Sequence, residues 1–316
     1  MTGAASFPAF VARRFALLLL TLVLVPSLSF VMFTLIQGDR TAPLDVLGEL
    51  GDYLSAVFLQ GELGSGNFRS DTFVRTRSAL DVVMDGILVD CYLLGAALAS
   101  GVLLGLAAGA FQATHPRTLA ARAIAVVTVI ALSSPVYWLG LVALLLFAPG
   151  IGSVAEIPFL STVSGYRDPF DDPIGFLHGL WLPALIVGAP LAAACTRMSE
   201  SQLRATLRED FVRTAHGKGV TRRRVVWRHA LPAAAGPVVA LVGVNMNLIL
   251  TNLALIETVF NVPGGFRYIE RALINRDVDL VQALIVEATL FIVLANFLAD
   301  AIHAWLDPRV RTGEPA

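Results

Sequence analysis

The sequence predicts an all-α membrane protein with six transmembrane helices. Three properties of the 316-residue chain support this fold class: 56% of its residues are hydrophobic, only 15% are charged, and the mean hydropathy is +0.72. A chain this apolar is not a soluble globular domain, and it is too long to be a single membrane anchor.

Six apolar stretches are long enough to cross a bilayer, which requires about 20 helical residues. The first follows Arg13 and Arg14. It is longer than the apolar core of a signal peptide and has no small-x-small cleavage site, so we expect it to be retained. Together the six helices form one transmembrane domain, residues 1–316. They comprise residues 13–36, 87–111, 122–147, 180–197, 233–256 and 281–305.

The loop between the first two predicted helices, residues 37–86, contains apolar residues at helical spacing. They are Leu44, Val46, Leu47, Leu50, Tyr53, Leu54 and Val57. This spacing predicts an amphipathic helix that lies on the membrane surface.

The distribution of basic residues predicts the orientation. With the N-terminus inside the cell, the inner segments hold 15 of the 23 Lys and Arg residues and the outer loops hold eight. Because Lys and Arg are enriched on the cytoplasmic side of membrane proteins, both termini are expected to be cytoplasmic.

Residues 197–232 form a polar segment between two apolar stretches and carry nine of the Lys and Arg residues. Leu203, Leu207 and Phe211 recur every four residues, which predicts a helix with one apolar stripe. Gly217 and Gly219 would break this helix, and Thr221 is positioned to cap a second one. A basic helical hairpin of this kind is suited to docking into a groove of another protein.

The sequence lacks the motifs of several function classes. Lys218 is the only lysine, and it stands in HGKGV with no Ser or Thr after it, so no P-loop is present and the chain is not expected to hydrolyse ATP. The five histidines have no metal-ligand spacing, and Cys91 and Cys195 are expected to be small buried hydrophobes. Only Glu287 and Asp300 are placed at membrane depth, which gives an ion-coupled carrier weak support.

The polar segment resembles the loop of bacterial ABC import permeases written EAA, three residues, G, nine residues, I-x-L-P. Ala215 takes the place of the last alanine, Gly219 that of the glycine, and Leu231 with Pro232 that of the final pair. Arg213, Thr214 and His229 depart from this pattern. In the dipeptide and oligopeptide branch the loop reads close to DYVRTARAKG and then RRxxxRHAL, which resembles residues 210–219 and 223–231 here.

Further motifs of that branch are similar along nearly the whole chain. One departure is Ile36-Gln37-Gly38-Asp39-Arg40, where the branch has APGDP. The similar elements are Gly61-Glu62-Leu63-Gly64-Ser65, Ser134-Pro135 with Trp138-Leu139-Gly140, Glu257-Thr258-Val259-Phe260 with Pro263-Gly264, and Leu306-Asp307-Pro308-Arg309.

The resemblance to this family, which includes nickel permeases, implies a type I ABC importer permease in the bacterial inner membrane. It implies half of a pore completed by a homologous second permease subunit. One or two ABC ATPase subunits would bind ATP and Mg, and an extracytoplasmic solute-binding protein would deliver the cargo. This chain would hold no catalytic, cofactor or metal site and would bind no nucleic acid. A short peptide is the expected cargo, with nickel, glutathione and oligosaccharides as alternatives.

The resemblance also assigns residues to roles. In the docking loop, the arginines would pair with acids of the ATPase or with anionic lipid head groups. The expected docking residues are Asp210, Arg213, Ala215, Gly217, Gly219, Arg223, Arg224, Arg228, Leu231 and Pro232.

Residues in and next to the predicted helices suggest three further sites. Asn245 and Asn252 share one helix face, which suits either a pore lining or hydrogen bonds between helices. Asn296 shares a face with Asp300 and His303, which suits either the inner vestibule or a clamp on a neighbouring helix. Glu257, Pro263 and Gly264 are expected to brace an outer gate.

The orientation can be tested with single cysteines in intact cells. Because the basic segments are expected to be cytoplasmic, cysteines at Thr221 and Gly313 should be shielded from an impermeant thiol reagent, whereas one at Ser65 should react. Labelling of a cysteine at Thr221 would show that the topology is the reverse of the predicted one.

Overall fold

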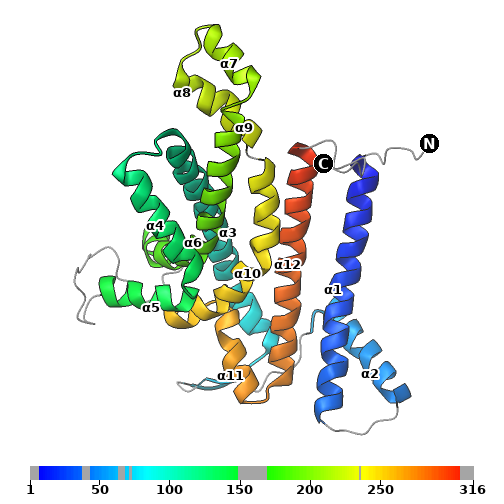
Figure 1. The fold of residues 1–316 in the computed structure, drawn as a ribbon. Helices are drawn as coiled ribbons and strands as arrows, with labels where there is room; N and C mark the ends of the chain where they lie inside the picture. The colour runs from blue at the N-terminus through cyan, green and yellow to red at the C-terminus, as the bar shows by residue number, and fades with distance from the viewer. Residues whose placement is uncertain are drawn as a thin grey trace. The chain divides into compact units, whose positions relative to one another are not determined.

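The computed structural model describes residues 7–37, 43–62, 68–70, 73–148, 169–234 and 236–306 (Figure 1). Residues 38–40, 63–65 and 307–309 of the family motifs lie outside this part. The chain forms two compact units, Met1–Cys91 with Pro263–Leu298 and Tyr92–Val262 with Ala299–Ala316. The described residues are overwhelmingly helical, which confirms the all-α fold class.

The first unit contains the N-terminal helices and most of the last one. Its elements are α1 (Phe7–Gln37), α2 (Pro43–Ser55), a π-helical turn (Ala56–Gln60), β1 (Phe68–Ser70), β2 (Phe73–Arg77), the start of α3 (Ala79–Thr114), a 3₁₀ turn (Phe266–Tyr268), α11 (Ile269–Ile274) and α12 (Val278–Leu306). The antiparallel pair β1 and β2, with Ser70 opposite Phe73, was not predicted from the sequence.

The core of the first unit joins α3, α11 and α12. Apolar residues at i, i+3 and i+4 on α3 and α12 place one face of each helix in this core. Phe33 of α1 and Tyr268 pack against it. The buried members are Ala79, Val82, Val83, Ala272, Leu280, Val281, Ala283 and Leu284. By contrast, only 6% of the residues in the most apolar part of α1 are buried, as expected for a helix that faces lipid.

The predicted amphipathic helix in the first loop is present as α2. The Tyr53 ring stacks on Phe30 of α1, with 4.8 Å between ring centroids. Burial, followed by the negative charge of Asp279, raises the pKa of Tyr53 to about 12. The apolar side of α2 therefore packs partly against the protein, and its position on a membrane surface remains a prediction.

The second unit is built around a long central helix, α6. This helix spans Pro173–Thr206. The other elements of the unit are the rest of α3, α4 (Leu119–Ser133), α5 (Val136–Phe147), α7 (Asp210–Gly217), α8 (Arg222–Val225), a π-helical turn (Val226–Ala230), α9 (Leu231–Ala234) and α10 (Gly236–Val259).

Glycines let α3 and α6 approach closely. Gly101, Gly105 and Gly109 recur every four residues on α3, a small-xxx-small pattern of membrane helix pairs. A Cβ on Gly105 would lie 2.8 Å from the Ala192 carbonyl oxygen, so only glycine fits there. The Ser199 hydroxyl of α6 donates to the Gly105 carbonyl at 3.2 Å and so links the two backbones.

The predicted helix boundaries need correction. Four described helices are long and apolar enough to span a membrane. A fifth span results if the two parts of α10, which are bent by 60°, count as one. Residues 122–147, predicted as one span, form the separate helices α4 and α5. Pro135 explains the break, because proline disfavours helical backbone at Ser134, whose ψ is 139°. The helices predicted at 87–111 and 180–197 are longer, at Ala79–Thr114 and Pro173–Thr206.

The expectation for the cysteines holds for one of them. Cys195 is buried, at the contact between α6 and Gly105. Cys91 is exposed, because its side chain is rotated by about 100° around α3 from the buried Asp90 before it. The prediction that Cys91 is buried was therefore wrong.

The glycine contact leads to a stability prediction. Gly105→Ala should destabilise the protein by about 1–3 kcal/mol, because its methyl group has no space against α6. Gly95→Ala on the same helix is the matched control, since nothing lies within 4 Å of its added Cβ. Thermal unfolding in detergent would measure both variants. Equal midpoints would show that the close approach of α3 and α6 does not limit stability.

Candidate functional site

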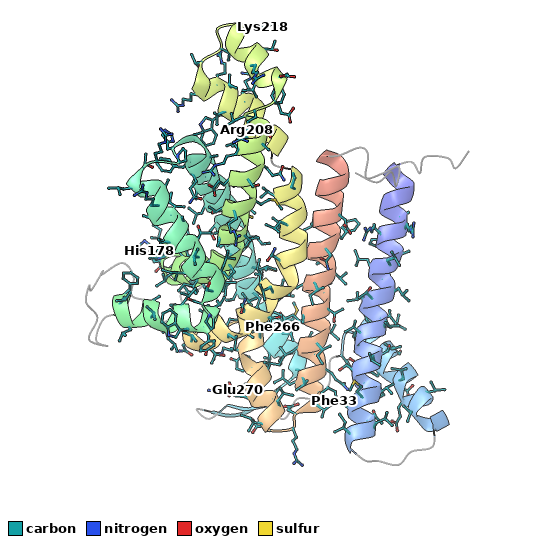
Figure 2. All side chains as sticks on the ribbon, in the orientation of Figure 1. Phe33, His178, Arg208, Lys218, Phe266 and Glu270 are labelled. Atoms are coloured by element: carbon teal, nitrogen blue, oxygen red, sulfur yellow. The ribbon has the colours of Figure 1, made fainter. Side chains whose placement is uncertain are left out.

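The basic segment folds as the predicted helical hairpin, at the end of α6 (Figure 1). Figure 2 shows Lys218 at its tip and Arg208 near its base. The first helix differs from the prediction, because α6 ends at Thr206 and α7 starts at Asp210. Leu203 is buried and Leu207 half-buried at the base, whereas Phe211 is 46% exposed, so the predicted continuous stripe is wrong. Separate packing of Leu207 at the base and of Val212 in α7 accounts for the break.

Gly219 makes the turn between the two arms. Its φ of 77° lies in the left-handed region, as expected from the sequence. The Val220 amide donates to the Ala215 carbonyl at 3.2 Å, which is the six-to-one bond of a Schellman motif with Gly219 just after the helix end. Gly217 is the last residue of α7 and lacks a positive φ. The two glycines therefore have different roles, and only Gly219 has a backbone that favours glycine.

The second arm begins where the sequence predicts. Thr221 directly precedes α8, and its carbonyl accepts a hydrogen bond from the Val225 amide at 3.0 Å. The arm then widens into a π-helical turn, in which the Leu231 amide donates a hydrogen bond to the Val226 carbonyl. Pro232 follows this turn. Because proline has no N–H to donate to the carbonyl four residues earlier, the wider turn occurs where the α-helical bond is lost.

A small apolar core fixes the base of the hairpin. It brings together the ends of α3 and α6 with the π-helical turn, and Leu207 and Leu231 pack against it. Its buried members are Ala110, Leu203, Val226 and Ala230. Val225 is also fully buried. The hairpin is therefore anchored in the second unit and is not an independent loop.

The outer surface of the hairpin is basic with two large apolar side chains. Trp227 is 55% and Phe211 46% exposed. Arg213 lies 3.6 Å from Asp210, but both side chains are almost fully exposed, so this ion pair contributes little to stability. The predicted docking residues Arg213, Arg223, Arg224, Arg228 and Pro232 are all exposed. Such a surface can form charge-assisted contacts with an acidic partner or with lipid phosphates.

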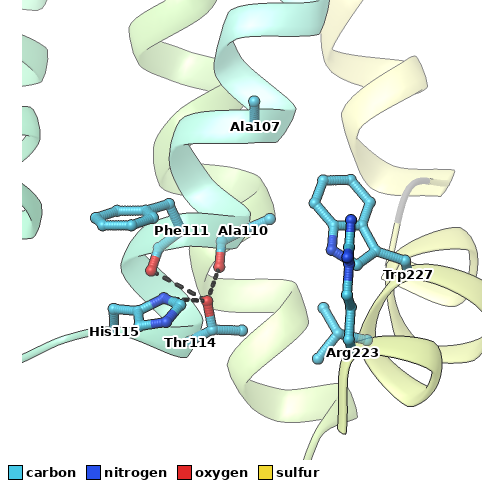
Figure 3. A pocket seen from close by; sticks show the side chains of 8 residues that line it. Ala107, Ala110, Phe111, Thr114, His115, Arg223 and Trp227 are labelled. Atoms are coloured by element: carbon cyan, nitrogen blue, oxygen red, sulfur yellow. Dashed lines mark hydrogen bonds between the residues drawn. The ribbon is translucent and has the colours of Figure 1, made fainter. Parts of the chain in front are cut away.

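A pocket of about 470 Å³ lies between the end of α3 and the second arm (Figure 3). Phe111 and His115, stacked at 4.9 Å, form one wall, and Arg223 and Trp227 form the other. The Thr114 hydroxyl donates to the Ala110 carbonyl at 2.7 Å. The hairpin therefore presents a hollow as well as a basic ridge.

The predicted pore residues are partly accessible. Asn245, Asn252 and Asn296 are all half-buried. The Asn245 amide donates to the Leu241 carbonyl of its own helix at 2.8 Å. That side chain is therefore satisfied locally, and neither role proposed for the asparagines is decided.

The residues expected at an outer gate lie in different units. Glu257 is fully buried in the second unit, and its carbonyl accepts a hydrogen bond from Val262 at 2.9 Å. Pro263 and Gly264 belong to the first unit, where the next residue, Gly265, donates to the Asp90 carboxylate at 2.9 Å.

Asp90 is a buried acid that the sequence analysis overlooked. It is fully buried within the apolar stretch 87–111, where its position alone would have identified it. The prediction that only Glu287 and Asp300 lie at membrane depth was therefore wrong.

Comparison with known proteins finds similar sequences over most of the chain. Residues 101–312 match the family model of the binding-protein-dependent transport system inner membrane component. The chain is 29% identical to the di/tripeptide transport system permease protein DppB of Pseudomonas aeruginosa, over 96% of this chain and 98% of that protein. It is 32% identical to the dipeptide transport system permease protein DppB of Escherichia coli, over 57% and 58% of the two chains. A putative peptide permease protein of Brucella ovis is 29% identical over 86% and 81%.

Proposed function

Because this chain belongs to the family of binding-protein-dependent transport system inner membrane components, we propose that it forms half of the pore of an ATP-driven importer of short peptides. A homologous permease subunit would form the other half. Separate ABC ATPase subunits would bind ATP and Mg, and an extracytoplasmic solute-binding protein would deliver the cargo.

The anchored hairpin is the observation that supports this proposal best. Its basic outer surface is suited to a groove on an ATPase subunit, and its apolar base joins it to α3 and α6. Movement of the ATPase subunits would therefore be passed directly to these helices. In this role, the hairpin and both termini would be cytoplasmic.

Peptide cargo is proposed from the relatives, whose names specify dipeptides, tripeptides or peptides. Nickel, glutathione and oligosaccharides remain alternative cargoes for the same machinery.

An ion-coupled carrier is the second candidate function. The observation that favours it is the presence of two buried acids, Asp90 and Glu287, in the first unit. It leaves the hairpin without a role, and we therefore favour the ATP-driven importer.

The turn at Gly219 provides a test of ATPase docking. Gly219→Val should strain a backbone with positive φ by about 1–3 kcal/mol and should sharply reduce transport and co-purification of the ATPase subunits. Gly61→Val is the matched control, because Gly61 also has a positive φ, of 70°, and no atom within 4 Å of an added Cβ, but it lies outside the docking loop. Normal ATPase association and uptake in Gly219→Val would refute the role of this turn.

The energy source can be tested in vesicles that contain the complete transporter. We expect uptake to require ATP and to continue when the proton and sodium gradients are collapsed. Glu287→Gln should retain substantial uptake, because it removes a charge that only an ion-coupled carrier would need. Uptake that survives ATP depletion but ends with the gradient, or with Glu287→Gln, would support the carrier instead.

A further inference from the structure

Two buried carboxyl groups meet at one turn of the first unit. Asp90 on α3 is fully buried, and Glu287 on α12 is only 2% exposed. Between them lies Gly265, whose amide donates to Asp90 Oδ2 at 2.9 Å. A Cβ on Gly265 would lie 2.7 Å from Glu287 Oε2 and 3.1 Å from Asp90 Oδ2. Both carboxyl groups therefore contact the same backbone position.

Both carboxylate oxygens of Glu287 are buried and have no hydrogen-bond partner among the described residues. Ionised carboxylates can only accept hydrogen bonds, so Asp90 and Glu287 can bond to each other only when one of them is protonated. Two adjacent charges at a buried site would also repel each other strongly. A proton on one of the two groups would remove this repulsion and supply the hydrogen bond that Glu287 lacks.

We propose that Asp90 and Glu287 form a proton-binding site, in which one shared proton joins the two carboxyl groups and holds the turn at Gly265 against α3 and α12. The pair then carries one negative charge in place of two, and the Gly265 amide donates to that charge. The proton is a structural ligand that stays bound, so the buried acids need no coupling to ion flow.

The shape of α3 supports this site. Gly86 and Asp90 are four residues apart and share one face of the helix. A Cβ on Gly86 would lie 2.6 Å from the Gly265 Cα and 2.9 Å from the Gly264 carbonyl carbon. On this face of α3, Gly86 leaves space for the turn at Gly265, and Asp90 accepts the hydrogen bond from the Gly265 amide.

The elements next to the site carry other ionisable groups. On α3, the exposed thiol of Cys91 directly follows Asp90 in the sequence. On the following turn, Arg267 lies over the Tyr268 ring at 4.7 Å. On α11, Glu270 and Arg271 are exposed. Cys91 is therefore the group most able to obscure a measurement, and the test uses a Cys91→Ser background.

The proposal predicts how stability depends on pH. The folded site holds its proton more tightly than the unfolded chain does, so the free energy of unfolding should fall as pH rises and the site loses that proton. Thermal unfolding of the complete protein in detergent, from about pH 6 to about pH 10, would measure this fall.

Two variants should remove this component of the pH dependence. In Glu287→Gln, the amide donates to Asp90 in place of the shared proton. In Asp90→Asn, the amide donates to Glu287, and the amide oxygen still accepts from Gly265. Glu270→Gln changes an exposed acid of the same unit and should keep the parent profile. Infrared spectra near neutral pH should show a protonated carboxyl band in the parent that Glu287→Gln lacks.

Two outcomes would overturn the proposal. Parallel pH profiles in the parent and in both variants would show that no shared proton contributes to stability. An increase in the parent unfolding temperature with Na⁺ or Mg²⁺ at constant ionic strength, absent from Glu287→Gln, would show that a metal cation occupies the site. Neither measurement depends on transport, so the result is independent of the proposed function.

Discussion

Backbone hydrogen bonding in a medium without water is the constraint on which the rest of this structure depends. Within a bilayer, every amide and carbonyl group needs a partner in the protein, which favours long uninterrupted helices. Where the chain leaves a helix and remains buried, another group must satisfy its backbone. The turn at Gly265 shows this directly, because its amide binds Asp90. A buried carboxylate such as Asp90 in turn needs a group that compensates its charge. Glu287 lies beside the same glycine, and the proposed shared proton would provide this compensation.

Close helix packing follows from the same constraint. Lipid provides little hydrophobic force between helices, so their association depends on contact area and on hydrogen bonds. The glycines at 101, 105 and 109 provide contact area by bringing the α3 backbone against α6, and Ser199 adds a hydrogen bond to Gly105. The hairpin stands at the end of this tightly packed pair. Its apolar base is therefore attached to a closely packed pair of helices in the second unit.

Composition and local chemistry predicted part of this arrangement. Hydropathy was sufficient to predict the all-α class. The position of Gly219 after a helix was sufficient to predict its positive φ. Pro135 was a visible reason to divide residues 122–147, but apolar length outweighed it in the prediction. The break before α7 has no local cause, because residues 207–209 contain neither Gly nor Pro. It depends on tertiary packing of Leu207 at the hairpin base. The site at Asp90 and Glu287 joins residues 197 positions apart, which sequence spacing alone does not reveal.

The proposed transmission of movement through the hairpin would depend on the rigidity of the hairpin. A flexible loop would absorb a displacement, whereas a hairpin with a buried base must move its neighbours. Here the Schellman bond at Gly219 restrains the tip, and Leu203 and Ala230 fix the base. Leu203 belongs to α6, a single helix from Pro173 to Thr206 with two internal prolines, Pro183 and Pro190. A displacement at the hairpin would thus reach Pro190 before it meets a residue that interrupts the helical hydrogen bonds. Since the glycines of α3 leave no space at this contact, α3 and α6 should move together rather than slide.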